Sequence, residues 1–138
     1  MDGANLEGMA SIAEELRRAL AGRTDVALAL LFGSQARGRA TPTSDVDVAV
    51  EAAADLDVLG LARDLTLAVG RDVDVVRLDA AGVPLLDEIL RDGIVVHEGR
   101  PSAHARWRAR ALSTLETDRP WFARMRDAWL RRVAERGI

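Results

Sequence analysis

The hydrophobic pattern of the chain alternates between helical spacing and short, uninterrupted apolar runs. From Leu6 to Ala21, apolar residues recur every three or four positions, which predicts an amphipathic helix that ends at Gly22. Val26–Phe32 is apolar throughout, as expected of a strand that is covered on both faces.

The rest of the chain continues this alternation. We predict strands over Val46–Val50, Asp72–Leu78 and Ile94–His97, and helices over Leu56–Val69, Val83–Arg91, Ala103–Glu116 and Pro120–Arg136. After the first strand, Gln35–Arg39 is predicted to form one helical turn and Thr41–Thr43 a turn. The order indicates an α/β fold in which a small mixed sheet of about four strands is flanked by helices and followed by a C-terminal helical extension.

The connection between the first two predicted strands is only 13 residues long. A parallel crossover needs about a dozen residues or more and usually contains a full helix, so an antiparallel pair is the simpler connection. That pairing would place Gly33 and Ser34, which follow the first strand, beside Asp45 and Asp47, which open the second.

Asp45 and Asp47 occupy alternate positions in an apolar run. Because side chains alternate along a strand, the two carboxylates face one side, with Cα atoms roughly 6–7 Å apart. Two like charges this close require a counter-charge, and oxygen ligands without His or Cys suit Mg²⁺ or Mn²⁺. The third strand offers Asp72 and Asp74, and Asp74 is the favoured third ligand because it lies deeper in the strand. An edge strand with a solvated face would show the same alternation.

The residues after the first strand have the chemistry of a phosphate site. Gly33 permits close approach of the backbone to a ligand, and Ser34 adds a hydroxyl donor. Arg37 and Arg39 follow and are placed to reach phosphate oxygens. Since Mg²⁺ usually binds through carboxylates together with substrate phosphates, the two groups of residues indicate one metal–nucleotide site.

Together these residues resemble the signature of the nucleotidyltransferase superfamily, which is Gly-Ser, ten residues and Asp-x-Asp. The chain matches it without a gap from Gly33 to Asp47. It is most similar to the minimal nucleotidyltransferases, or MNT antitoxins, which are encoded beside HEPN toxins. The resemblance covers Leu6 to Glu98, which suggests a catalytic domain over residues 1–99 and a helical tail over residues 100–138.

The resemblance implies an enzyme that transfers AMP from ATP to a hydroxyl, typically of tyrosine, on its HEPN toxin, and thereby acts as an antitoxin. It implies two Mg²⁺ ions, or Mn²⁺, bound by Asp45, Asp47 and Asp74. It also implies a nucleotide-binding set that consists of Gly33, Ser34, Arg37, Arg39 and Ser44. Asp74 would in addition help to activate the acceptor hydroxyl.

Two other functions remain open from the sequence. A non-catalytic antitoxin would neutralise its toxin by binding alone, although such a protein has no need to hold repelling carboxylates together. A small-molecule nucleotidyltransferase, of the aminoglycoside-modifying type, would need an enclosed acceptor pocket. The helical residues 100–138 leave little chain to build one.

Composition and charge limit the compartment and the partners. The chain has no Cys, no apolar run of the ~20 residues that span a bilayer, and an acidic N-terminus unlike a signal peptide, so we expect a cytoplasmic protein without a membrane partner. Residues 1–99 carry 9 Arg and 18 acidic residues, whereas residues 100–138 carry 10 Arg and 4 acidic residues. This split suggests an interaction surface in the tail. The low overall pI of 5.4 argues against DNA as the main partner.

The tail also holds most of the aromatic residues, which are Trp107, Trp121, Phe122 and Trp129. Trp and Arg are enriched at interface hot spots, so we expect the tail to dock a partner protein in a hetero-oligomer, although packing on the chain's own sheet fits equally well. The chain contains no Tyr, so a tyrosine acceptor must belong to another chain. His97 and His104 are not needed by this chemistry and are expected to have no catalytic role.

Overall fold

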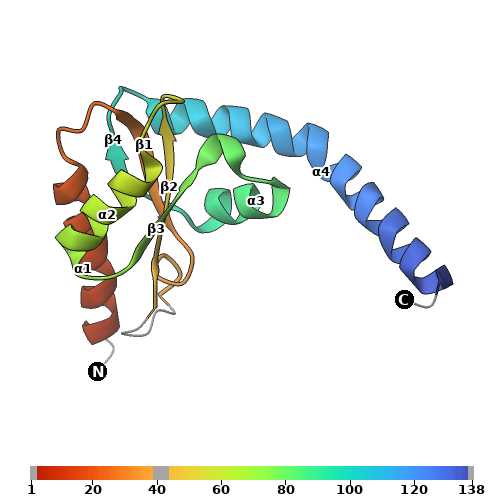
Figure 1. Ribbon diagram of the computed structural model, residues 1–138, viewed down its shortest axis with the longest axis horizontal. Coiled ribbons are helices and arrows are strands. Elements are labelled where there is room, and N and C mark those ends of the chain that lie inside the picture. The colour runs from red at the N-terminus through yellow and green to blue at the C-terminus, as the bar shows by residue number, and fades with distance from the viewer. Residues whose placement is uncertain (1–2, 39–43, 137–138) are drawn as a thin grey trace.

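The computed structural model describes residues 3–38 and 44–136 of the 138-residue chain. Its elements are α1 (Gly3–Leu20), β1 (Val26–Phe32), β2 (Val46–Ala52), α2 (Val58–Val69), β3 (Val73–Arg77), the 3₁₀ helix η1 (Leu78–Ala80), α3 (Val83–Asp92), β4 (Ile94–Glu98) and α4 (Ala103–Arg136). Figure 1 shows a central sheet with α1 and α2 on one side and α3 and α4 on the other. The predicted α/β fold is confirmed.

The sheet is mixed and has the strand order β3-β2-β1-β4. β1 is antiparallel to both β2 and β4, whereas β2 and β3 are parallel. The antiparallel β1–β2 pair confirms the prediction from the short connector, since Phe32 at the end of β1 is the partner of Asp47 near the start of β2.

Each face of the sheet packs against its own pair of helices. All seven residues of β1 are buried, as their unbroken apolar run predicts for a strand covered on both faces. Val48 and Val50 of β2 join the core beneath α1 and α2. Ala49 joins the core that contains Phe32, Leu86 and Trp107, beneath α3 and α4. Odd-numbered positions of β2 therefore face the α3–α4 side.

Local signals fix most helix ends. The Asp57 side chain accepts a hydrogen bond of 3.0 Å from the Gly60 N–H, so α2 begins at Val58, two residues later than predicted. Gly70 ends α2 in the left-handed conformation, with φ +72°. Pro84 lies in the first turn of α3, where its missing N–H costs nothing.

The tail differs from the prediction, because one continuous helix replaces the two that were expected. α4 runs for 34 residues and contains Pro120 in its interior. Pro120 removes the hydrogen bond to the Glu116 carbonyl, but this position is exposed and water can satisfy the carbonyl. Figure 1 shows α4 changing direction midway along its length, as proline inside a helix commonly causes.

No helix within the described ranges is both long enough and apolar enough to cross a membrane.

Candidate functional site: a carboxylate cluster beside a glycine turn

The end of β1 lies directly against the first residues of β2. Gly33 has a left-handed φ of +77°, and a Cβ atom at this position would lie 2.5 Å from Asp47 Oδ2. A side chain here would thus be strained by the backbone and would also displace the carboxylate. Glycine is required at this point because the chain turns away from the sheet while touching Asp47.

Two of the predicted carboxylates are direct neighbours across the β2–β3 pair. Asp47 and Asp74 are register partners in the parallel ladder, and the Val46 N–H donates a 2.9 Å hydrogen bond to the Asp72 carbonyl just before it. Asp45 immediately precedes β2. Asp47 is half-buried, while Asp45 and Asp74 are exposed. The structure therefore gathers Asp45, Asp47 and Asp74 at one end of the sheet and leaves Asp72 outside β3.

The electrostatics of the cluster are unbalanced. Burial raises the pKa of the Asp47 carboxyl above its usual value, and the negative charges of Asp74, Asp45 and Glu88 raise it further. The Arg37 guanidinium acts in the opposite direction and lowers it. Each of the three negative charges acts on Asp47 more strongly than Arg37 does, so the cluster holds more negative charge than Arg37 neutralises.

The turn after Gly33 is anchored to the cluster by a residue that sequence reasoning missed. Residues 33–38 form consecutive turns, in which the Arg37 N–H donates to the Gly33 carbonyl over 3.1 Å. This single i→i+4 bond is close to the one helical turn that was predicted to begin at Gln35. Gln35 is only 2% exposed, and its Nε2 donates to the Ser44 carbonyl over 3.4 Å. Gln35 thus links the Gly-Ser turn to the residue before Asp45. A polar residue beside Gly-Ser was its only signal in the sequence.

Glu88 is a second residue that sequence reasoning missed. Arg37 Nη1 donates to Glu88 Oε1 over 2.8 Å, which ties the turn to α3. Glu88 lies between the buried Leu86 and Ile89, so nothing in its local pattern distinguishes it from an ordinary helix-surface residue. The predicted phosphate ligand Arg39 and the predicted turn Thr41–Thr43 lie outside the described residues.

The described side chains form no group of three or more His, Cys, Asp or Glu residues that is ready to hold a metal ion. The chemistry of the donors nevertheless fits Mg²⁺ or Mn²⁺, because three carboxylates share one end of the sheet without a nitrogen or sulfur ligand. The raised pKa of Asp47 also indicates that added positive charge would be stabilising there. Asp45, Asp47 and Asp74 are therefore the residues that fit such an ion.

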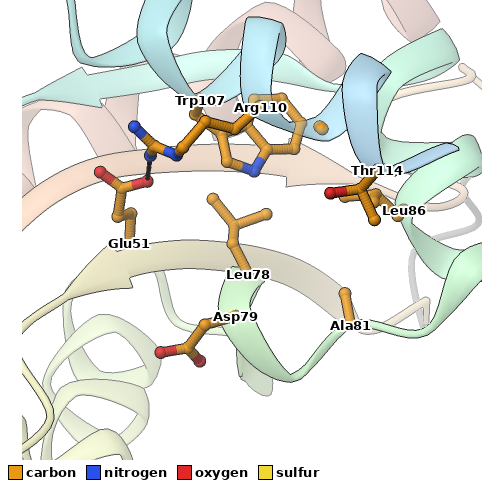
Figure 2. A pocket seen from close by; sticks show the side chains of 9 residues that line it. Glu51, Leu78, Asp79, Ala81, Leu86, Trp107, Arg110 and Thr114 are labelled. Carbon is orange, nitrogen blue, oxygen red and sulfur yellow. Dashed lines mark hydrogen bonds and ion pairs between the residues drawn. The ribbon is translucent and has the colours of Figure 1, made fainter. Parts of the chain in front are cut away.

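A separate cavity of about 320 Å³ lies toward the other end of β2, between η1 and α4. Figure 2 shows Arg110 of α4 reaching Glu51 of β2 across this space, above Leu78, with Trp107 beside them. Glu51 is four residues further along β2 than Asp47 and is already paired with Arg110. The cavity is thus distinct from the carboxylate cluster.

The two histidines make structural contacts away from the cluster. His97 Nε2 lies 3.0 Å from the Arg23 carbonyl and 3.1 Å from the Val26 carbonyl, at the start of β1. The His104 ring stacks on Trp107 at a centroid separation of 6.1 Å. These contacts give both rings a place in the packing of the fold, and the absence of a catalytic role stays a prediction.

Comparisons with known proteins agree with this geometry. Residues 14–101 match the family described as Polymerase beta, Nucleotidyltransferase, a span that contains Gly33, Asp45, Asp47 and Asp74. A comparison with curated protein sequences finds no match.

Solved structures of toxin–antitoxin complexes share the fold. A chain of a toxin–antitoxin complex with AMP-PNP is 25% identical, with a TM-score of 0.68, over 85% of this chain and 98% of that chain. A mutant MntA–HpeT complex contains a chain that is 27% identical, with a TM-score of 0.63, over 81% and 93% of the two chains. A chain of a complex of tri-AMPylated Shewanella oneidensis HEPN toxin with MNT antitoxin is 24% identical, with a TM-score of 0.60, over 91% of this chain and 98% of that chain. This match shows the fold alone.

These matches confirm the resemblance to the nucleotidyltransferase superfamily and to its minimal, antitoxin-type branch. The family match spans more than half of the chain and includes the whole carboxylate cluster with its glycine turn. The chain belongs to the Polymerase beta nucleotidyltransferase family.

Proposed function

We propose that this protein transfers AMP from ATP to a side-chain hydroxyl of a HEPN toxin and acts as the antitoxin of that pair. The observation that carries the proposal is the contact of Gly33 with Asp47, which is itself the register partner of Asp74. This contact joins a turn with the chemistry of a phosphate site to the carboxylate cluster. The similar complexes add support, since one contains AMP-PNP and another contains an AMPylated HEPN toxin.

In the proposed reaction, the acceptor oxygen forms a bond to the α-phosphorus of ATP. The bond from that phosphorus to the bridging oxygen of the β-phosphate breaks, and pyrophosphate leaves with the electron pair. The hydroxyl proton passes to the Asp74 carboxylate, which is exposed and accessible to an incoming side chain. Asp74 is the better base for this purpose because Asp47 is half-buried and less accessible to the acceptor side chain.

The other residues bind and orient the nucleotide. Gly33 and Ser34 offer backbone N–H groups and a hydroxyl to the phosphates, and Arg37 offers a guanidinium once it leaves Glu88. Asp45, Asp47 and Asp74 would hold Mg²⁺, which when bound neutralises phosphate charge and polarises the reacting phosphorus. Ser44 and Arg39 remain predicted nucleotide ligands.

The acceptor belongs to another protein if it is a tyrosine, because this chain has none. The test is to incubate the protein with Mg²⁺, ATP and a HEPN protein encoded beside it, with the ³²P label on the α-phosphate in one reaction and on the γ-phosphate in a second. AMP transfer predicts label on the HEPN protein only from the α-position. Label from the γ-position would instead indicate phosphorylation, and no label from either would contradict the proposal.

A matched pair of variants assigns the transfer to this site. Asp74→Asn removes the register partner of Asp47 and should abolish transfer, with a loss of at least about 100-fold. Asp72→Asn removes an equal charge two residues earlier, outside β3, and should leave transfer nearly unchanged. Equal effects of the two substitutions would mean that the reaction does not use this cluster.

A further inference from the structure

The apolar stripe of α4 is covered along its first half and uncovered along its second. Ala103, Trp107, Ala111 and Leu115 recur every four residues and are buried against the body. An α-helix of 3.6 residues per turn repeats its direction after about 18 residues. Eighteen residues further on stand Trp121, Met125, Trp129 and Val133, which continue the same stripe. Trp121 is 55% exposed and Trp129 is 57% exposed.

The change from covered to uncovered occurs at a defined place. Arg119 Nη2 forms an ion pair with Asp87 of α3 over 2.6 Å. Beyond it, Figure 1 shows α4 projecting past α3 and away from the sheet. We call residues 121–136 the arm. Contiguous apolar surface of this kind on a water-facing helix is typical of a protein interaction site.

The arm combines this stripe with positive charge. Residues 121–136 contain five Arg and two acidic residues. A hollow of about 400 Å³ on the arm is lined by Trp121, Arg124, Met125, Asp127, Ala128 and Arg131. An apolar side chain seated in this hollow would lie near Arg124 and Arg131, which are placed to pair with acidic residues beside it.

We infer that the arm is the docking surface for the acceptor protein and takes a helix whose apolar side chains are bordered by acidic residues. This inference rests on the proposed function and names where its partner binds. Charge complementarity favours such a partner over a second copy of the arm, since two arms placed face to face would oppose Arg with Arg. Trp and Arg are also the residues that dominate interface hot spots.

The position of the arm suits this role. α4 covers the face of the sheet to which the odd positions of β2 point, because Ala49 packs in the same core as Trp107. Asp47 occupies an odd position of that strand. A protein held by the arm would therefore lie on the side of the sheet toward which the Asp47 carboxylate is directed.

Two neighbouring residues provide a matched test. Trp129 lies on the stripe, whereas Leu130 is 50% exposed and points about 100° away from it. We would measure binding of this protein to a HEPN protein encoded beside it, without ATP, by isothermal titration calorimetry. Trp129→Glu should weaken binding about 30-fold or more, whereas Leu130→Glu should change it less than about threefold. Circular dichroism and ATP binding should be the same for both variants.

Other results would overturn the inference. Equal binding by Trp129→Glu and wild type would place the partner elsewhere. Light scattering that shows the wild-type chain alone as an oligomer, and Trp129→Glu as a monomer, would assign the arm to a second copy. Tight binding of a labelled single-stranded RNA that is lost in Trp129→Glu would assign it to nucleic acid. Each result is independent of catalysis, so failed AMP transfer alongside intact, Trp129-dependent binding would refute the proposed function and leave the docking surface standing.

Discussion

Gly33 lies so close to Asp47 that a β-carbon on the glycine would stand 2.5 Å from the Asp47 Oδ2 atom. The same glycine has a φ of +77°, so both its backbone and its surroundings exclude a side chain. The contact explains why the Gly-Ser and Asp-x-Asp parts of the motif act together, because the antiparallel pairing of β1 and β2 makes them one site.

We expect Gly33→Ala to abolish AMP transfer while the protein stays folded. The alanine methyl group would push the Asp47 carboxylate out of position, which should reduce the transfer rate by at least about 100-fold. Gly22→Ala is the matched control, since Gly22 has a similar φ of +80° but nothing within 4 Å of its added Cβ. Both variants should lose about 1–2 kcal/mol of unfolding free energy from backbone strain, as measured by urea denaturation. A Gly22→Ala variant that loses transfer equally would refute the steric explanation.

Asp47→Asn should stabilise the metal-free protein at neutral pH. Burial and the charges of Asp74, Asp45 and Glu88 raise the folded-state pKa of Asp47 above its usual value of 3.8. Ionised Asp47 therefore lowers the free energy of unfolding at pH values above the folded-state pKa, and this cost disappears as the pH falls below the unfolded-state value.

The measurement is thermal unfolding in EDTA across pH. Asp47→Asn should have a higher Tm than wild type at about pH 7, and the difference should shrink toward zero at about pH 3. Asp72→Asn provides the comparison, because Asp72 is exposed and its pairing with Val46 uses only its backbone carbonyl. A stabilisation of Asp47→Asn that persists unchanged at about pH 3 would contradict the electrostatic origin.

Arg37 and Glu88 should affect nucleotide binding in opposite directions. Arg37 is held by Glu88 at 2.8 Å and must release it to reach a phosphate. We expect Arg37→Ala to raise the KM for ATP about tenfold, the usual effect of losing a charged hydrogen bond. Glu88→Gln frees Arg37 and should lower that KM by about two- to fivefold, as suits a partly exposed ion pair.

Asp87→Asn is the control for this pair, since Asp87 is the preceding residue of α3 but binds Arg119 of α4. It should leave the KM for ATP unchanged. If Glu88→Gln raises the KM instead, Glu88 is a positioning residue for Arg37. Glu88 and the phosphate would then not compete for the Arg37 guanidinium.

Trp107 and Trp129 should differ sharply in their contribution to stability, although they belong to one helix. Trp107 is 5% exposed in the core beneath α3 and α4, so Trp107→Ala should cost about 3–5 kcal/mol of unfolding free energy. Trp129 is mostly exposed, so Trp129→Ala should change stability by less than about 0.5 kcal/mol. Urea denaturation monitored by circular dichroism measures both. A large loss in Trp129→Ala would mean that the arm packs on the body in solution.

Local sequence was sufficient for most of the fold. The strand bounds of β1 were predicted without error because seven successive apolar residues leave no alternative face to expose. The antiparallel pairing of β1 and β2 followed from the length of the connector alone. The tail was predicted wrongly, as two helices, because Pro120 usually marks a helix start and its tolerance depends on exposure, which only the folded chain determines.

The chain's sequence by itself determined which residues have the chemistry of the site, since Gly33, Asp45 and Asp47 belong to a motif of fixed spacing. The sequence favoured Asp74 over Asp72, but only the tertiary structure showed that Asp74 is the register partner of Asp47, because strand register depends on pairing between distant segments. It also decided the places of Gln35 and Glu88, whose roles come from contacts across the fold. The apolar stripe of α4 shows the same division. Helical spacing in the sequence determines which residues share a face, but the folded position of α3 determines which of these residues are covered and which remain exposed.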